Sequence, residues 1–166
     1  GWTSTATSTT IATAGAQQTA FGGGTFDAFL VKFNSSGVRQ WGTFYGGNGN
    51  ERGYSTCTDL SGNIYLSGLT NSSTGTAIAT SGAFQSNFGG GFDAYLVKFD
   101  GTGARQWATY YGGTGNESGN SICTDTSGNV LMTGYTTASA GGSIASVGAF
   151  QANFGGYADA YVVKFD

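Results

Sequence analysis

Proline and histidine are both absent from this sequence of 166 residues, and charged residues make up only 9% of it. The missing histidine removes the usual general base for a serine or cysteine nucleophile, which argues against a hydrolase of that kind. The 6 basic residues are scattered, whereas a nucleic-acid-binding surface needs them clustered. No apolar run approaches the roughly 20 residues of a membrane-spanning helix. These absences favour a non-enzymatic protein with no cofactor, no nucleic-acid partner and no membrane span.

Glycine and aromatic side chains are what the sequence has in quantity. It contains 31 glycines, and 14% of its residues are aromatic, far more than a disordered chain carries. Because charges are few, solubility must come from Ser, Thr, Asn and Gln. This composition is typical of an extracellular or cell-surface β protein. No signal peptide is visible, and since the chain opens inside a repeat, we expect an excerpt whose leader lies elsewhere.

A long internal repeat organises the chain. Asp27, Asp93 and Asp159 recur at an interval of 66 residues, and 26 of 42 positions are identical between residues 27–68 and 93–134. The repeat divides the chain into four predicted parts. These are a leading connection (1–26), a first blade with its connection (27–92), a second blade with its connection (93–158) and the inner strand of a third blade (159–166).

Each unit reads as four short strands separated by turns. The segment "DAFLVKF" (27–33) is apolar on both of its alternating faces, which indicates a strand buried on both sides. Hairpin turns at "NSSG" and "LSGN" place glycine where a positive φ is needed. The predicted fold is therefore all-β, with tandem four-stranded antiparallel sheets that bury their faces against one another. Radial stacking gives a β-propeller, and an open stack or superhelix is the alternative.

The segment 82–136 resembles the SBBP family, the bacterial seven-bladed beta-propeller repeat. The resemblance is carried by "GAFQ" before "FGG", by Asp-Ala-aromatic before the first strand, by aromatic-Tyr-Gly-Gly in the second, and by "D-x-SGN" before the last. It extends over essentially the whole chain. It implies propeller blades in secreted or surface proteins of bacteria, and it implies no enzymatic activity.

Two and a half repeats cannot close a ring alone. An unpaired inner strand at 159–166 would be an exposed edge that is prone to aggregation. We therefore expect it to pair with strands outside this chain or to pack on the neighbouring blade. The expected partners are other copies of the chain, or the remainder of a longer chain, that complete the blades.

Two glycine-rich loops carry the candidate metal ligands, Asn50 and Glu51 in one and Asn116 and Glu117 in the other. Oxygen-rich loops can hold Ca²⁺, which takes six to eight oxygen ligands. The alternative is a turn in which Asn adopts a left-handed conformation and Glu caps local amides or pairs with Arg. Asp59 and Asp125, in "D-x-SGN", fit an Asx-type hairpin turn.

Other recurring residues are expected to be structural. Lysines inside the inner strands must reach solvent or find partners, and we expect them to line a central channel and pair across blades with the aspartates that precede these strands. Arg39 and Arg105 are placed to stack on the tryptophans two residues further along. The two cysteines are expected to be small buried hydrophobes in the third strand, too far apart for a disulfide. The full set is Asp27, Asp93, Asp159, Lys32, Lys98, Lys164, Trp41, Trp107, Cys57 and Cys123.

The leading functional interpretation is a structural or adhesive repeat module that self-assembles into an extended filament or a ring-shaped scaffold. The alternative is a propeller that binds glycans or proteins through its Ser/Thr/Asn loops and through exposed aromatic residues among Trp2, Tyr45, Tyr111 and Tyr135. Catalysis is the third and least favoured reading.

Overall fold

The computed structural model describes residues 1–4, 11–73, 77–138 and 144–166. These residues contain no helix, and hence none that is long and apolar enough to cross a membrane. They form ten β-strands, which are β1 (Trp2–Thr3), β2 (Asp27–Phe33), β3 (Arg39–Tyr45), β4 (Glu51–Thr58), β5 (Ile64–Thr70), β6 (Asp93–Phe99), β7 (Arg105–Tyr111), β8 (Glu117–Thr124), β9 (Val130–Thr136) and β10 (Asp159–Phe165). The predicted all-β class is confirmed.

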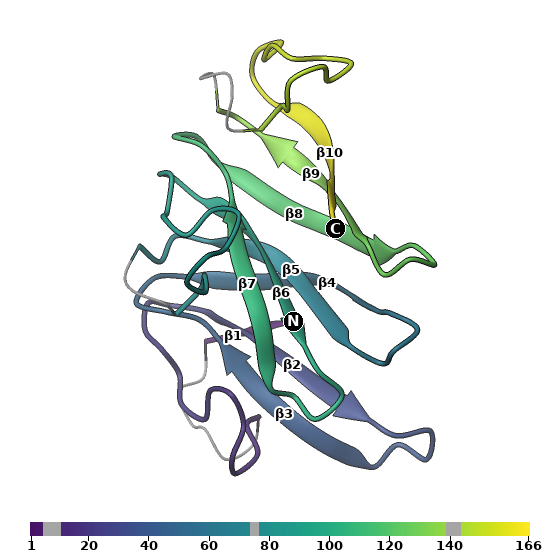
Figure 1. The fold of residues 1–166 in the computed structure, drawn as a ribbon. Coiled ribbons are helices and arrows are strands. Elements are labelled where there is room, and N and C mark those ends of the chain that lie inside the picture. Colours follow the sequence, from purple (N-terminus) through teal and green to yellow (C-terminus); the bar gives the residue numbers. More distant parts are fainter. Residues whose placement is uncertain (5–10, 74–76, 139–143) are drawn as a thin grey trace.

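The strands form three antiparallel sheets that follow one another in space (Figure 1). The middle sheet has the order β4-β5-β6-β7, and the end sheets have the orders β1-β2-β3 and β10-β9-β8. Across the sheets, β8 contacts β4, β5 and β6, while β4 also contacts β1 and β2. The sheets are therefore stacked face to face, as the apolar faces of the strands predict.

The pairing of strands corrects the prediction that one 66-residue unit forms one sheet. The middle sheet takes β4 and β5 from the end of one unit and β6 and β7 from the start of the next. The glycine-rich segment 46–50 carries the chain from one sheet to the next, whereas the long connection between β5 and β6 returns to the same sheet. Residues 27 and 93 thus begin strands that lie between two others, whereas residue 159 begins β10 at the edge of the last sheet.

Two of the strands predicted to be innermost in their blades, β2 and β6, therefore lie between two other strands. β6 lies between β5 and β7, so it is the third strand counted from β4. Of the two alternatives expected for 159–166, contact with the neighbouring blade is observed as strand pairing, because β10 pairs with β9 along its length, from Asp159 opposite Thr136 to Phe165 opposite Val130. Pairing with strands outside the chain stays a prediction. No strand of the described residues pairs with the other edge of β10.

The connections between units cover one edge of each of the first two sheets, at β3 and at β7. The backbone of Thr13 donates a hydrogen bond to Gly42 on β3, and Phe44 of β3 donates one to Gln18. The next unit repeats both contacts. The backbone of Thr80 donates to Ala108 on β7, and that of Tyr110 on β7 donates to Gln85. A covered edge cannot template pairing with another chain, which is how natural sheets avoid aggregation.

The hairpin turns form as predicted. Asp59 accepts hydrogen bonds at 2.9 Å from the backbone of Ser61 and of Asn63, which is an Asx turn. Asp125 repeats this arrangement. Gly62 and Gly128 follow with φ values of 80° and 86°, which side chains with a Cβ adopt only with strain.

Candidate functional site

Each face of the middle sheet carries an apolar set that packs against a neighbouring sheet. On one face, Leu66, Tyr95, Val97 and Phe99 are buried in a cluster with residues of the β1–β3 sheet that include Ala28 and Leu30. On the other face, Tyr65, Ala94, Leu96 and Tyr111 are buried with residues of the β8–β10 sheet that include Val130, Met132 and Tyr161. Burial of such side chains is the main source of stability for these junctions.

The outward faces of the two end sheets carry the counterparts of these side chains. Ala160 and Val162 on β10 form a face that we term the trailing face. They are equivalent to Ala28 and Leu30 on β2 and to Ala94 and Leu96 on β6, which are buried, yet the Val162 side chain is 74% exposed. The face of β2 formed by Phe29, Val31 and Phe33, here termed the leading face, corresponds to Tyr95, Val97 and Phe99, yet Phe33 is 58% exposed. The two faces therefore carry the two halves of the packing found at the internal junctions.

A pair of buried carboxyl groups spans the first junction. Asp27 of β2 and Glu51 of β4 are both fully buried. Asp27 Oδ2 accepts hydrogen bonds from the backbone of Gly22 at 2.7 Å and from the Gln18 amide at 3.2 Å. Its other oxygen, Oδ1, has no hydrogen-bond partner. A buried polar atom left without a partner is costly and rare in folded proteins.

Glu51 is held by donors from its own sheet and its own loop. Its Oε1 accepts hydrogen bonds from the Thr70 hydroxyl at 2.6 Å and the Ser72 hydroxyl at 2.5 Å. Its Oε2 accepts one from the backbone of Gly47 at 2.9 Å. The predicted capping of local amides by this residue is therefore confirmed.

The second junction repeats the arrangement. Asp93 of β6 and Glu117 of β8 are fully buried, and Asp93 Oδ1 again has no hydrogen-bond partner. Thr136 donates to Glu117 Oε1 at 2.7 Å and Gly113 to Oε2 at 2.7 Å. Burial, together with the smaller effect of the negative charge of the facing glutamate, raises the pKa of Asp27 to about 6 and that of Asp93 to about 7.

The third aspartate of the series differs. Asp159 accepts hydrogen bonds from Gln151 and Gly155, as its counterparts do from the equivalent residues, but both contacts are exposed. Sequence reasoning named these aspartates and glutamates separately and missed that they meet. The available signal was that both recur at the same interval beside glycine-rich segments.

The contacts of the two loops do not identify their side chains as metal ligands. Asn50 Oδ1 accepts hydrogen bonds from the backbone of Thr25 and Phe26, and Asn116 Oδ1 accepts one from Phe92. A cation needs oxygens that face it, whereas these oxygens face N–H and O–H donors. The described residues include no cluster of three or more metal-ligating side chains. The predicted left-handed Asn is wrong, because in the described chain Tyr157 alone among non-glycine residues has a positive φ.

The lysines bond differently from the prediction. Lys98 lies 3.8 Å from Asp59 and Lys164 lies 3.4 Å from Asp125, so each pairs with a turn of its own sheet. Lys32 does reach the next sheet, where its ammonium group donates to the Gly101 carbonyl oxygen at 2.8 Å. The prediction that the lysines pair across blades with Asp27, Asp93 and Asp159 is therefore wrong, because those aspartates accept hydrogen bonds from glycine backbones and glutamine side chains.

The tryptophans occupy the junctions. The Trp41 indole N–H donates to the Gly101 carbonyl oxygen at 3.1 Å, and Trp107 packs edge-on against Tyr65 at 6.1 Å between ring centres. Arg39 and Arg105 donate hydrogen bonds to the backbone carbonyls of Ile11 and Ala77. Their stacking on the tryptophans stays a prediction. A cation–π contact that the sequence did not suggest places Arg52 5.1 Å from the centres of both the Trp2 and Phe26 rings.

The cysteines are free thiols, and only one of them is shielded. Cys57 is half-buried and packs against the cluster between the second and third sheets, where burial raises its pKa to about 11. Cys123 is exposed, which corrects the prediction that both are buried. The difference arises because the side chain equivalent to Cys57 lies on the outward side of the last sheet.

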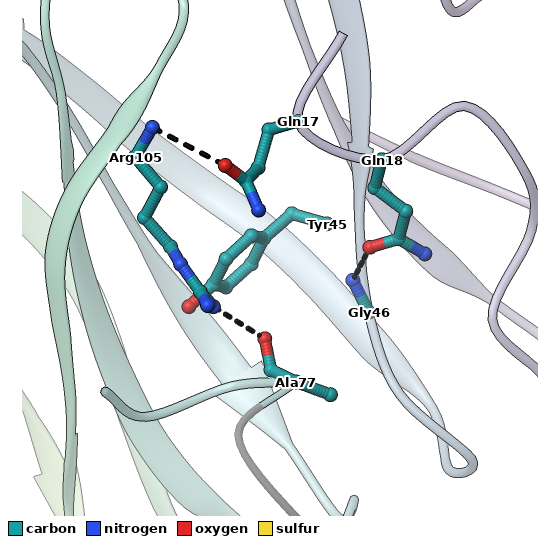
Figure 2. A pocket seen from close by; sticks show the side chains of 6 residues that line it. All are labelled: Gln17, Gln18, Tyr45, Gly46, Ala77 and Arg105. Atoms are coloured by element: carbon teal, nitrogen blue, oxygen red, sulfur yellow. Dashed lines mark hydrogen bonds between the residues drawn. The ribbon is translucent and has the colours of Figure 1, made fainter. Parts of the chain in front are cut away.

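A polar cavity of about 300 Å³ opens between the first two sheets, lined by Gln17, Gln18, Tyr45, Gly46, Ala77 and Arg105 (Figure 2). Its walls are held by hydrogen bonds from Arg105 to Ala77 at 2.8 Å and from Gly46 to Gln18 at 3.0 Å. Of the aromatic residues proposed for glycan contact, Trp2 and Tyr135 are exposed. Tyr45 and Tyr111 are buried, and their hydroxyl groups donate to Ile78 and Ile144.

The stacked antiparallel sheets, one of four strands and two of three, have the arrangement of incomplete propeller-type blades. Residues 106–139 match the family model SBBP, described as a beta-propeller repeat. The predicted resemblance to the SBBP beta-propeller repeat is therefore confirmed for residues 106–139. No curated protein matches the chain.

Proposed function

We propose that this chain is a non-enzymatic structural or adhesive module of a secreted or cell-surface bacterial protein, and that it builds a scaffold by packing further blades onto its two outward faces. The observation that carries this proposal is the correspondence between exposed and buried faces. Ala160 and Val162 of the trailing face repeat Ala94 and Leu96, which are fully buried against the next sheet. The partner is a unit of the same kind, whether from the same polypeptide or from a second copy.

The leading face supplies the matching surface. At both internal junctions, the side chains equivalent to the leading face pack against the sheet before them. These are Tyr95, Val97 and Phe99 on β6, and Tyr161, Val163 and Phe165 on β10. Phe29, Val31 and Phe33 present the same alternation on the first sheet. Since leading and trailing faces differ, contact between them is head-to-tail, and such contacts generate rings or open stacks according to the rotation between units.

Chemistry on a substrate receives little support from the same residues. The carboxyl groups that come together, Asp27 with Glu51 and Asp93 with Glu117, are fully buried and so have no access to a substrate. The sequence also contains no histidine. A scaffold role does not require the buried carboxyl groups to be accessible to a substrate.

The decisive measurement is the size of the purified chain by light scattering over a range of concentrations. We expect concentration-dependent higher-order species, and we expect Val162→Lys to abolish them because a charge on the trailing face cannot be buried without a partner. Leu60→Lys is the matched control, since Leu60 is 87% exposed in the turn after β4, away from both faces. A wild-type chain that stays monomeric at every concentration, or equal behaviour of the two lysine variants, refutes assembly of copies through the trailing face.

The cavity between the first two sheets supports a second candidate function, the binding of a small polar ligand such as a glycan. Its lining offers the Gln17 and Gln18 amides and the Arg105 guanidinium group, and its volume is at the low end for ligand sites. A glycan array probed with the wild-type chain and with Gln17→Ala tests this candidate. Hits that the substitution removes support it, and an array without hits rejects glycans as the ligand.

A further inference from the structure

Two carboxyl groups approach each other across each sheet junction, on either side of a glycine. A Cβ atom added to Gly46 would lie 2.8 Å from Asp27 Oδ1 and 2.6 Å from Glu51 Oε2. At the second junction, a Cβ on Gly112 would lie 2.6 Å from Asp93 Oδ1 and 2.8 Å from Glu117 Oε2. The oxygen of each aspartate that has no hydrogen-bond partner is therefore the one on the side of the facing glutamate.

Two ionised carboxylates in such a place would be doubly unfavourable. Each is removed from water, and each lies in the field of the other. A single proton removes both problems, because it cancels one charge and converts one oxygen into a hydrogen-bond donor toward the other carboxylate. The buried dyads of aspartic proteases hold one proton between two carboxyl groups for this reason.

We propose that Asp27 with Glu51, and Asp93 with Glu117, each bind one proton between two buried carboxyl groups, and that losing this proton loosens the junction between adjacent sheets. Because the two carboxyl groups of each pair belong to different sheets, the charge on the pair affects the junction between sheets and not the pairing of strands within one sheet. Asp27 belongs to the sheet of β1–β3 and Glu51 to the sheet of β4–β7. When both are ionised, like charges repel across the boundary between the two sheets.

The other titratable groups around the pairs are phenols, and they stay neutral in the relevant range. Tyr45, Tyr95 and Tyr110 interact electrostatically with Glu51, Tyr110 also with Asp93, and Tyr161 with Glu117. Burial raises the pKa of all four hydroxyl groups, that of Tyr110 to about 12. The positively charged Arg105 side chain interacts with the Tyr45 hydroxyl group. The proton exchanged near neutral pH therefore belongs to the carboxyl pair.

The sign of the effect follows from linkage. An aspartate whose pKa is higher in the folded chain than in the unfolded chain keeps its proton to a higher pH when folded. The folded state is then favoured at low pH, and stability declines as the pH rises from about 4 to about 6 for Asp27 and to about 7 for Asp93. Within this range each pair increases the unfolding equilibrium constant by up to about tenfold per pH unit.

The experiment has two independent arms on the whole chain. In the first, the side-chain carboxyl carbons of ¹³C-labelled wild-type protein are titrated by NMR from pH 4 to 9. We expect Asp27 and Asp93 to change protonation near pH 6 and 7, well above the solvent-exposed Asp100, whose pKa is lowered by a hydrogen bond from the Thr102 hydroxyl. Titration of Asp27 and Asp93 together with Asp100 overturns the proposal, whatever any variant does.

In the second arm, the urea midpoint is followed against pH for wild type, for the double variant Asp27→Asn with Asp93→Asn, and for Asp159→Asn. An asparagine can donate permanently to the facing glutamate, so we expect the decline above pH 4 to be flattened in the double variant. Asp159→Asn should keep the wild-type slope, since its contacts are exposed. Equal slopes in all three proteins refute the proposal. Stabilisation of the wild type, but not of the double variant, by calcium chloride at pH 8 also refutes it, since the pairs would then bind a cation in place of a proton.

Discussion

The hydroxyl group of Tyr95 donates a hydrogen bond over an intervening strand to the backbone carbonyl oxygen of Arg52, at 3.3 Å. Tyr95 is on β6 and Arg52 on β4, while Gly68 of β5 lies opposite Tyr95 beneath the ring. Tyr161 repeats the contact with Ser118, at 3.0 Å, over Gly134. A tyrosine lying across a glycine therefore ties the first strand to the third in two consecutive sheets.

Substitution of that glycine should be severe. A Cβ on Gly68 would lie 1.7 Å from the Arg52 carbonyl oxygen, which is backbone and cannot turn away. We expect Gly68→Ala to lower the free energy of unfolding by about 3 kcal/mol or more, at the upper end for forced overpacking. Urea denaturation monitored by tryptophan fluorescence measures the loss. Gly101→Ala is the control, because its added Cβ meets its nearest atom at 3.6 Å and should cost less than about 0.5 kcal/mol. Similar losses in both would contradict this account.

Removal of a donor to a buried glutamate should also be costly. Thr70→Val deletes the hydroxyl that donates to Glu51 Oε1 at 2.6 Å and keeps the shape of the side chain. A carboxylate deprived of a buried donor should lower the free energy of unfolding by about 1–3 kcal/mol. The comparison is with Thr102→Val, which removes an exposed hydroxyl bonded to Asp100 at 2.6 Å. Chemical denaturation of the two variants should separate them clearly, and equal effects would show that burial is not the deciding factor.

Acid should weaken the Asx turns. The hydrogen bond from the Asn129 side chain is the largest cause that lowers the pKa of Asp125 to about 2. Folding thus favours the ionised form, so this contribution is present above about pH 4 and is lost as the pH falls toward 2. Asp125→Asn should reduce the drop in urea midpoint over this interval. The reverse change, Asn34→Asp, should enlarge it, because Asn34 already holds an equivalent turn through Ser36 and Val38. Unaltered acid sensitivity in both would refute this explanation.

The two thiols should differ in reactivity. Cys123 is exposed, whereas Cys57 is half-buried with its pKa raised to about 11 by burial. Since the thiolate is the nucleophile, brief treatment with iodoacetamide at pH 8 should modify Cys123 well before Cys57. Peptide mass spectrometry gives the extent at each site, and the urea-unfolded chain provides the control in which both react alike. Faster modification of Cys57 in the folded chain would contradict the structure.

Strand positions follow closely from sequence, whereas strand partners do not. The alternation in "DAFLVKF" and the glycine of each hairpin identify β2 and its turn, because both signals are local. Partnership is not local. The segment 46–50 is as short as a hairpin loop, and residues 71–92 are long enough to reach another sheet, so loop length suggests the wrong pairing. In the structure the short segment changes sheets and the long one returns.

The same limit applies to the buried carboxyl pairs. Asp27 was expected beside lysines and Glu51 beside local amides, and the second of these expectations is confirmed. Their meeting across a junction depends on segment 46–50 passing between sheets, which no local pattern indicates. Exposure is equally non-local, since Cys57 and Cys123 share a sequence context and differ only in whether a sheet lies beyond them.

The offset between sequence unit and sheet has a consequence for how such a gene changes length. The middle sheet joins two strands of one unit to two strands of the next, so in a longer array of this period the loss or duplication of any 66 consecutive residues leaves every strand beside a neighbour of the kind it already had. Unequal recombination between repeats can therefore break the coding sequence at any point, inside a strand as readily as inside a loop, and still encode a shorter or longer array with all its junctions intact.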